Sequence, residues 1–131
     1  MKKVTVFGTF DGLHLGHLNF FKQAKALGDY LIIVVARDIN VEKIKGRLPK
    51  LDENQRLEVI RRQGIADKLI LGHFKDPYFY IKKEKPEIIC LGYDQAGFAH
   101  GLEAKFPKIK IVRLKPYKPE IYKSSKLKKY A

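Results

Sequence analysis

The sequence predicts an α/β domain in which helices cover both faces of a five-stranded parallel sheet. Apolar runs of strand length alternate along the chain with segments whose apolar residues recur at helical spacing. The run at residues 30–36 is apolar at nearly every position and rich in β-branched side chains, which is typical of a strand covered on both faces. Strands that alternate with helices favour a parallel sheet, and no linker or repeat divides residues 1–131 into two domains.

The elements follow one another in a simple order. Five apolar runs predict the strands, at residues 4–7, 30–36, 68–72, 87–92 and 108–114. Four segments between them predict helices, at residues 17–27, 53–63, 77–83 and 99–105. The basic stretch before the second helix shows no clear period and is expected to be an irregular loop, and a lysine-rich tail follows the last strand at residues 115–131.

Local signals place two of the helix starts. Asp52 comes directly before the second helix and Gln55 follows three residues later, which is the pattern of a capping box. Gly64 then marks the end of that helix. Asp76 and Pro77 are a suitable N-cap and first-turn pair for the third helix.

The charge balance favours anionic partners. The chain has 27 lysine and arginine residues against 14 aspartate and glutamate residues, a net charge of +13. Nucleic acid and a small molecule with a polyphosphate both fit this charge, and charge alone does not separate them. No apolar run approaches the roughly 20 residues of a membrane helix, so we expect a cytoplasmic protein. Cys90, the single cysteine, lies in an apolar run and is expected to be a small buried residue.

Residues 8–17, GTFDGLHLGH, are the strongest candidate for a binding site. They follow the first predicted strand, at the sheet edge where parallel α/β folds bind ligands. His17 is expected to open the first helix, whose N-terminal amide groups suit a phosphate. Gly16 leaves room for an anion to approach the backbone, and His14 is within reach of the same anion. Two imidazoles there could stabilise charge that builds up in a transition state.

Other interpretations of this stretch are open on the residues alone. The glycines Gly8, Gly12 and Gly16 do not fit the G-x-G-x-x-G fingerprint, and the chain has no P-loop motif. Two histidines three residues apart could be a loop surface without chemistry. A zinc site would need further ligands, and His73 and His100 lie in other segments.

A family resemblance rests on four segments in a fixed order, which are GTFDGLHLGH at 8–17, ARDINVEKIKGRLPKLDENQR at 36–56, LGYDQ at 91–95 and EIYKSSKL at 120–127. They resemble the motifs of the cytidylyltransferase-like nucleotidyltransferase superfamily, whose hallmark is H-x-G-H after the first strand. The resemblance covers nearly the whole chain. It implies a single Rossmann-like domain that transfers a nucleoside monophosphate from ATP or CTP to a phosphate-bearing acceptor and releases pyrophosphate.

The resemblance also implies roles for particular residues. His14, His17 and Lys43 would be catalytic, with both histidines holding phosphates and the transition state. The remaining matches would bind the nucleotide, and they are Gly8, Thr9, Phe10, Asp11, Gly16, Lys45, Arg56, Gly92, Asp94, Tyr122, Ser124 and Ser125. Mg²⁺ is the expected divalent cation, carried by the triphosphate rather than held by protein ligands.

Several of these residues have structural alternatives. Lys43 and Lys45 could belong to a solvated charged face, and Arg56 could be a charge on a helix surface. Asp94 could form a turn, and the serines of the K-S-S-K segment could cap a helix or lie in a disordered tail.

The substrate pair that the resemblance favours is ATP and FMN, because the second and third segments most resemble the archaeal FAD synthetase group. CTP and glycerol 3-phosphate are the alternative pair. A basic nucleic-acid-binding module is a distant alternative that rests on the net charge of +13, although no recognised nucleic-acid motif occurs. Members of the superfamily commonly form dimers, so a homodimer is possible.

Overall fold

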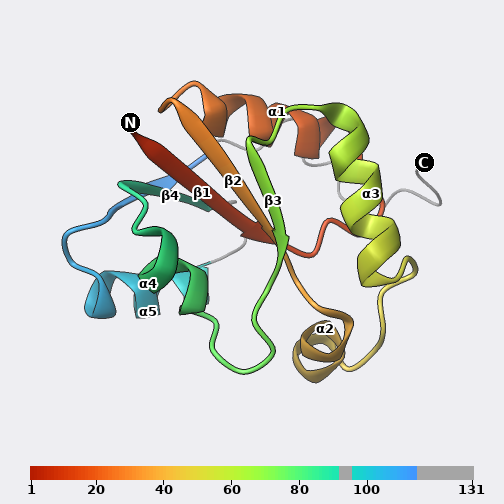
Figure 1. Cartoon of the computed structure of the whole chain (residues 1–131). Helices are drawn as coiled ribbons and strands as arrows, with labels where there is room; N and C mark the ends of the chain where they lie inside the picture. The colour runs from red at the N-terminus through yellow and green to blue at the C-terminus, as the bar shows by residue number, and fades with distance from the viewer. Residues whose placement is uncertain (92–95, 115–131) are drawn as a thin grey trace.

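The computed structural model describes residues 1–91 and 96–114, apart from the side chains of residues 96–100. The described residues form one five-stranded sheet with the order β3-β2-β1-β4-β5 (Figure 1). Each pair of neighbouring strands is parallel, as predicted. The strands are β1 (Lys3–Gly8), β2 (Tyr30–Val35), β3 (Lys68–Leu71), β4 (Ile88–Leu91) and β5 (Lys110–Arg113).

Helices cover both faces of the sheet, which confirms the predicted architecture. The first face carries α1 (Leu15–Lys25) and α3 (Glu53–Gln63), and the opposite face carries α4 (Phe79–Glu84) and α5 (Ala96–Lys105) (Figure 1). A further helix, α2 (Asp38–Lys45), covers neither face and lies beyond the carboxyl ends of the strands.

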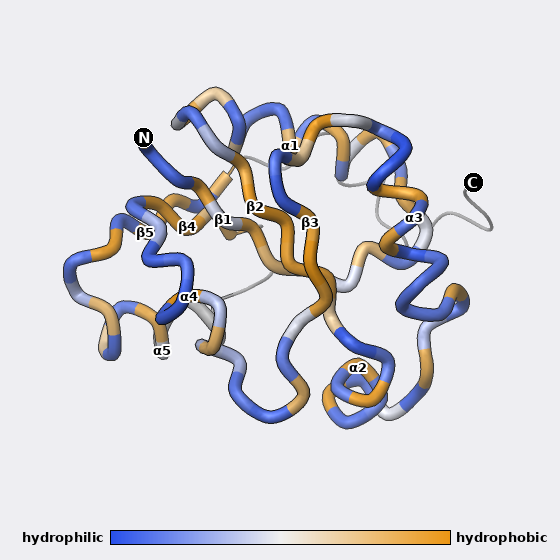
Figure 2. Tube along the Cα trace, viewed as in Figure 1, coloured by the Kyte–Doolittle hydropathy of each residue, from blue (hydrophilic) through white to orange (hydrophobic). Residues whose placement is uncertain are grey.

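The two faces of the sheet bury separate groups of side chains because successive residues of a strand point to opposite sides. Val4 and Val6 of β1 pack with Phe21 of α1 and Ile60 of α3 in the larger core. Ile89 and Leu91 of β4 belong to the smaller core, which includes Ile81 of α4 and Leu102 of α5. Figure 2 shows the apolar residues concentrated along the strands. Burial within this sheet raises the pKa of the Cys90 thiol to about 12, as suits a buried apolar residue.

Helix α3 forms where its local signals place it. The Asp52 carboxylate accepts from the Gln55 amide at 2.8 Å, and the Gln55 side chain accepts from the Asp52 amide at 3.0 Å. Gly64 ends the helix with a left-handed φ of 67°. The predicted capping box and glycine stop are therefore confirmed.

Three other helix starts differ from the sequence prediction. Helix α1 begins at Leu15 rather than at His17, and His14 is its N-cap. Helix α4 begins at Phe79 rather than at residue 77, because the Asp76 side chain forms a turn and accepts from the Tyr78 amide at 2.9 Å. Helix α5 begins at Ala96, three residues before the expected start.

The prediction of an irregular loop after the second strand was wrong for residues 38–45, which form α2. This helix ends at Gly46, which has a φ of 77°. Its N-cap, Arg37, makes no side-chain capping bond, so the usual start signal is missing.

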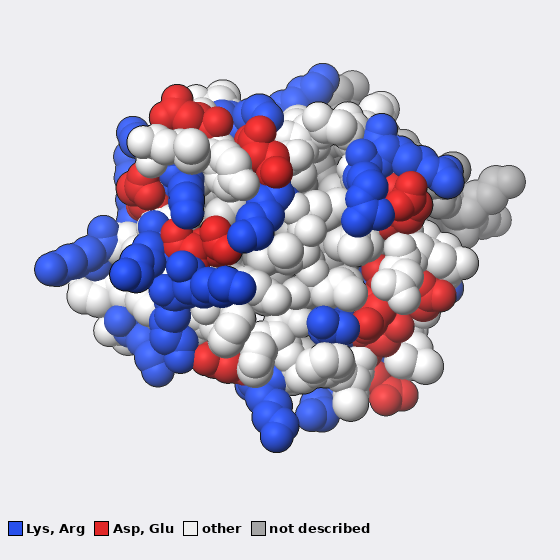
Figure 3. Space-filling model, viewed as in Figure 1, with Lys and Arg blue, Asp and Glu red and all other residues white. Residues whose placement is uncertain are grey.

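The described residues contain no helix long and apolar enough to cross a membrane. Lysine and arginine side chains are prominent in Figure 3, most densely on the side of the molecule that carries α4, with acidic side chains among them.

Candidate active site

The loop between β1 and α1 turns sharply at the carboxyl edge of the sheet. Phe10 has a φ of 55°, which is uncommon for a residue with a side chain, and Gly12 has a φ of 78°. The turn brings the chain back so that α1 starts at the same edge. The N-terminus of this helix and the end of β1 therefore meet at the place where the sequence predicts a phosphate site.

His14 and His17 form a capping box at the start of α1. The Nδ1 atom of His14 accepts from the Gly16 amide at 3.0 Å, and the Nδ1 atom of His17 accepts from the His14 amide at 3.3 Å. Histidine fills here the two positions that Ser and Glu usually occupy in such a box. The two rings are stacked, with centroids 4.0 Å apart and planes 25° apart.

These bonds fix the tautomer of both rings. A neutral imidazole whose Nδ1 atom accepts a hydrogen bond carries its proton on Nε2. Burial, and secondarily the neighbouring His14, lowers the pKa of His17 to about 3. Burial also lowers the pKa of His14. Both imidazoles are therefore neutral near pH 7, and each carries its proton on Nε2.

Phe10 supports one member of the histidine pair, His17. Its buried ring packs edge-on against Phe21, with centroids 5.0 Å apart, and against His17 at 5.6 Å. A Cβ atom at Gly8 would lie 2.5 Å from Cζ of the Phe10 ring. The absence of a side chain at Gly8 therefore lets the ring take its place, so both residues influence the site through the position of His17.

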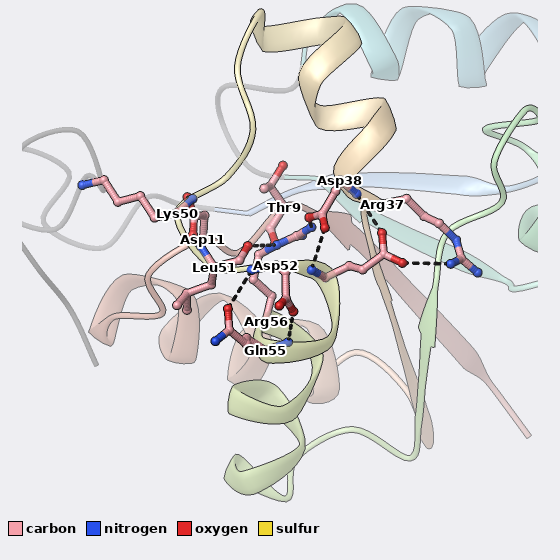
Figure 4. A network of polar contacts seen from close by, with 10 residues as sticks. Thr9, Asp11, Arg37, Asp38, Lys50, Leu51, Asp52, Gln55 and Arg56 are labelled. Atoms are coloured by element: carbon pink, nitrogen blue, oxygen red, sulfur yellow. Dashed lines mark hydrogen bonds and ion pairs between the residues drawn. The ribbon is translucent and has the colours of Figure 1, made fainter.

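Arg56 is fully buried, which excludes the surface-charge alternative. Its Nη1 atom donates to the Thr9 carbonyl at 2.8 Å, and its Nε atom donates to the Leu51 carbonyl at 3.0 Å. Its Nη2 atom binds the Asp38 carboxylate at 2.7 Å (Figure 4). The guanidinium is therefore committed to protein groups and holds the end of β1, the start of α2 and the segment before α3 together.

Asp38 and Glu53 are functional candidates that the sequence analysis missed. The Glu53 amide donates to Oδ2 of Asp38 at 3.1 Å, and the Asp38 amide donates to Oε1 of Glu53 at 2.9 Å. Arg37 adds a bond of 3.0 Å from Nη1 to Oε2 of Glu53. The starts of α2 and α3 thus cap one another, although 15 residues separate the two acids. The only local signal was an acidic residue in the first turn of each helix.

Asp11 ties the loop after β1 to the segment before α3. Its two carboxylate oxygens accept from the Lys50 amide at 2.8 Å and from the Leu51 amide at 3.1 Å (Figure 4). Among the described residues, no group of three His, Cys, Asp or Glu side chains lies close enough to hold a metal ion. Through these two hydrogen bonds, Asp11 anchors the chain before α3.

A cavity of about 150 Å³ opens between this loop and α2. The described residues that line it are Thr9, Asp11, Val41, Lys45, Arg47, Leu48, Pro49 and Lys50. Lys45 therefore lies at the cavity, whereas Lys43, on the same helix, is exposed and is not among these lining residues.

The remaining predicted site residues divide into two groups. Gly16 takes part through its amide, which donates to His14. The others lie outside the described residues, and they are Gly92, Asp94, Tyr122, Ser124 and Ser125.

Comparisons with known proteins agree with this fold. The model of the family described as "Cytidylyltransferase-like" matches residues 5–129. A relative named FAD synthase from Thermoplasma volcanium is 41% identical over 133 residues, which cover 98% of this chain and 93% of that protein. A second FAD synthase, from Methanosarcina barkeri, is 48% identical over 109 residues, which cover 82% of this chain and 76% of that protein.

A solved structure supports the same assignment. The crystal structure described as the lipopolysaccharide core biosynthesis protein from Thermoplasma volcanium GSS1 superposes with a TM-score of 0.81 at 43% identity, covering 89% of this chain and 98% of that one. The Rossmann-like fold is thereby confirmed. The chain belongs to the cytidylyltransferase-like family and is a nucleotidyltransferase.

Proposed function

We propose that this protein is an FMN adenylyltransferase, which transfers AMP from ATP to FMN to give FAD and pyrophosphate. The observation that carries the proposal is the stacked pair of neutral histidines, His14 and His17, at the carboxyl edge of the sheet. It occurs in a chain that is 41% identical, over 98% of its length, to a protein named FAD synthase.

The reaction needs positioning and charge stabilisation rather than a covalent intermediate. An oxygen of the FMN phosphate attacks the α-phosphorus of ATP and forms a new P–O bond. The bond between the α-phosphorus and the oxygen that bridges to the β-phosphorus breaks, and pyrophosphate leaves with the electron pair. His14 and His17 donate their Nε2–H groups to oxygens that gain negative charge in this step. Neither ring has to gain or lose a proton.

The other residues take supporting roles in this proposal. Lys43 and Lys45 bind phosphates, and Thr9 and Gly16 contribute at the end of β1 and the start of α1. Nucleotide binding by Gly92, Asp94, Tyr122, Ser124 and Ser125 rests on the family resemblance. Gly8, Phe10, Asp11 and Arg56 act through the contacts that place the loop and the histidines.

The triphosphate would carry the expected divalent cation, Mg²⁺. Mg²⁺ commonly binds through substrate phosphates and keeps several waters, rather than sitting in a cage of protein side chains. When bound, the ion neutralises phosphate charge.

The direct test incubates purified protein with Mg²⁺ and either ATP with FMN or CTP with glycerol 3-phosphate, and follows pyrophosphate. We expect release of pyrophosphate and formation of FAD with the first pair. Turnover with the second pair alone would overturn the choice of substrates.

Two further expectations concern partners. A nucleic-acid-binding role would instead show salt-dependent retention of DNA or RNA in a filter-binding titration. Pairing of two copies, as is common in the superfamily, is checked by sedimentation.

A further inference from the structure

The cavity beside Thr9 is lined by both charged and apolar side chains. Lys45, Arg47 and Lys50 contribute positive charge, and Val41, Leu48 and Pro49 contribute apolar surface. Asp11 is the one acidic residue among the described lining residues. Its carboxylate already accepts two backbone amide hydrogens. The described part of the cavity therefore favours an anion that also has an apolar portion.

The segment from Asp38 to Leu51 contributes most of the lining residues of this cavity. Hydrogen bonds hold it at both ends, and side chains in its middle are exposed to solvent. At one end, Arg56 and Glu53 fix the start of α2 through Asp38. At the other end, Asp11 holds the amides of Lys50 and Leu51. Between these anchors, the Leu48 side chain is 58% exposed at the cavity wall. Leu48 therefore offers apolar surface at the wall of the cavity, where a bound ligand could contact it.

The size of the cavity limits what can enter. Its volume of about 150 Å³ is close to that of an engineered cavity of about 150 Å³ that takes up benzene. It can hold a phosphate with a few attached carbons, but not the whole of FMN. The rest of such a ligand has to extend over the rim, where Leu48 offers apolar contact.

We propose that this cavity is the acceptor subsite, and that Leu48, with Val41 and Pro49, selects a phosphate monoester with a flat apolar body. This inference rests on the proposed function and deepens it. A polyol phosphate such as glycerol 3-phosphate has little apolar surface and would leave the wall formed by Leu48, Val41 and Pro49 in contact with water. An aromatic body instead removes the wall from water.

The chain offers a matched control for Leu48. Ile44 lies on the same segment and is also aliphatic and exposed, at 83%, but it is not among the described lining residues. Both side chains are exposed, so neither Leu48→Ala nor Ile44→Ala should unfold the protein. Only Leu48→Ala should change acceptor binding.

The first experiment measures KM for FMN and for ATP in the wild type and both variants. Leu48→Ala should raise KM for FMN about fivefold, the scale of losing part of one leucine contact, and leave KM for ATP unchanged. Ile44→Ala should change neither constant. An unchanged KM for FMN in Leu48→Ala would overturn the inference, while FAD formation by the wild type would still support the proposed function.

The second experiment tests the subsite without the reaction. If the wild type formed no FAD, the proposed function would be refuted, and this binding experiment would still decide whether the cavity prefers an aromatic phosphate. Binding of phenyl phosphate and of glycerol 3-phosphate to the full-length protein is measured by calorimetry. The wild type should prefer phenyl phosphate, and Leu48→Ala should lose most of that preference. Equal affinities of the wild type for phenyl phosphate and glycerol 3-phosphate would overturn the proposal that this cavity selects an aromatic phosphate.

Discussion

Asp38 and Glu53 each cap the helix that the other begins. Their side chains and main-chain amides exchange two hydrogen bonds, of 2.9 and 3.1 Å, across the gap between α2 and α3. The same Asp38 carboxylate neutralises the buried guanidinium of Arg56, which in turn holds the Thr9 carbonyl. The geometry of the candidate site therefore depends on an acid that touches neither histidine.

We predict that Asp38→Ala destabilises the protein by about 3 kcal/mol, because it leaves the buried charge of Arg56 without the carboxylate that neutralises it. The change is measured as the free energy of unfolding in urea. Glu58→Ala is the control, since its ion pair with Arg61 is exposed to solvent and should contribute little to stability. Similar losses of unfolding free energy in Asp38→Ala and Glu58→Ala would contradict a stabilising role of the buried Asp38 network.

Gly8→Ala should disturb the site through packing. Its new methyl group would overlap the Phe10 ring, which supports His17. We expect a loss of about 1–3 kcal/mol in stability and a reduced kcat. Gly72→Ala is the comparison, because its nearest neighbour would lie at an ordinary 3.5 Å. A Gly8→Ala variant with wild-type stability and kcat would contradict this assignment.

The low pKa of His17 predicts a dependence of stability on pH. The unfolded chain protonates this residue near its usual pKa of about 6.5, whereas the folded protein does so only at about 3. Between these values the unfolded state binds more protons, so stability falls as the pH falls. The lowered pKa of His14 acts in the same direction.

His17→Asn isolates this contribution. Because the variant lacks the titrating ring, the difference in unfolding free energy between the wild type and His17→Asn should shift against the wild type as the pH is lowered from 7 to 4. The shift is at most about 1.4 kcal/mol per pH unit. Urea titrations at several pH values measure it, and a difference that does not vary with pH would refute a buried neutral His17.

The elements that could be predicted are those whose signals are local. Apolar runs predict the strands. A capping box between Asp52 and Gln55, three residues apart, predicts the start of α3. Helix α2 was missed because its N-cap residue, Arg37, makes no capping bond and Glu53 supplies the bond from 15 residues away. A sequence pattern that spans only a few residues around the start of α2 cannot include Glu53.

The site shows the same division. His14 and His17 stood out through their spacing, but their use of both Nδ1 atoms as helix caps was not expected, since histidine is not a preferred capping residue. Arg56 was noticed, yet its burial depends on Thr9, 47 residues away, and on Asp38. The sequence thus indicated the two histidines and Arg56 but not Asp38, and the roles of all of them required the folded contacts.

The central claim is that the paired imidazoles stabilise the transition state of nucleotidyl transfer. The most direct test is the kcat of His14→Asn, assayed as pyrophosphate release from ATP and FMN. Asparagine is among the best N-cap residues, so the start of α1 and the melting temperature should be retained, whereas the Nε2–H donor is lost. We predict a fall in kcat of about 100-fold or more. Wild-type turnover in a folded His14→Asn protein would contradict the account.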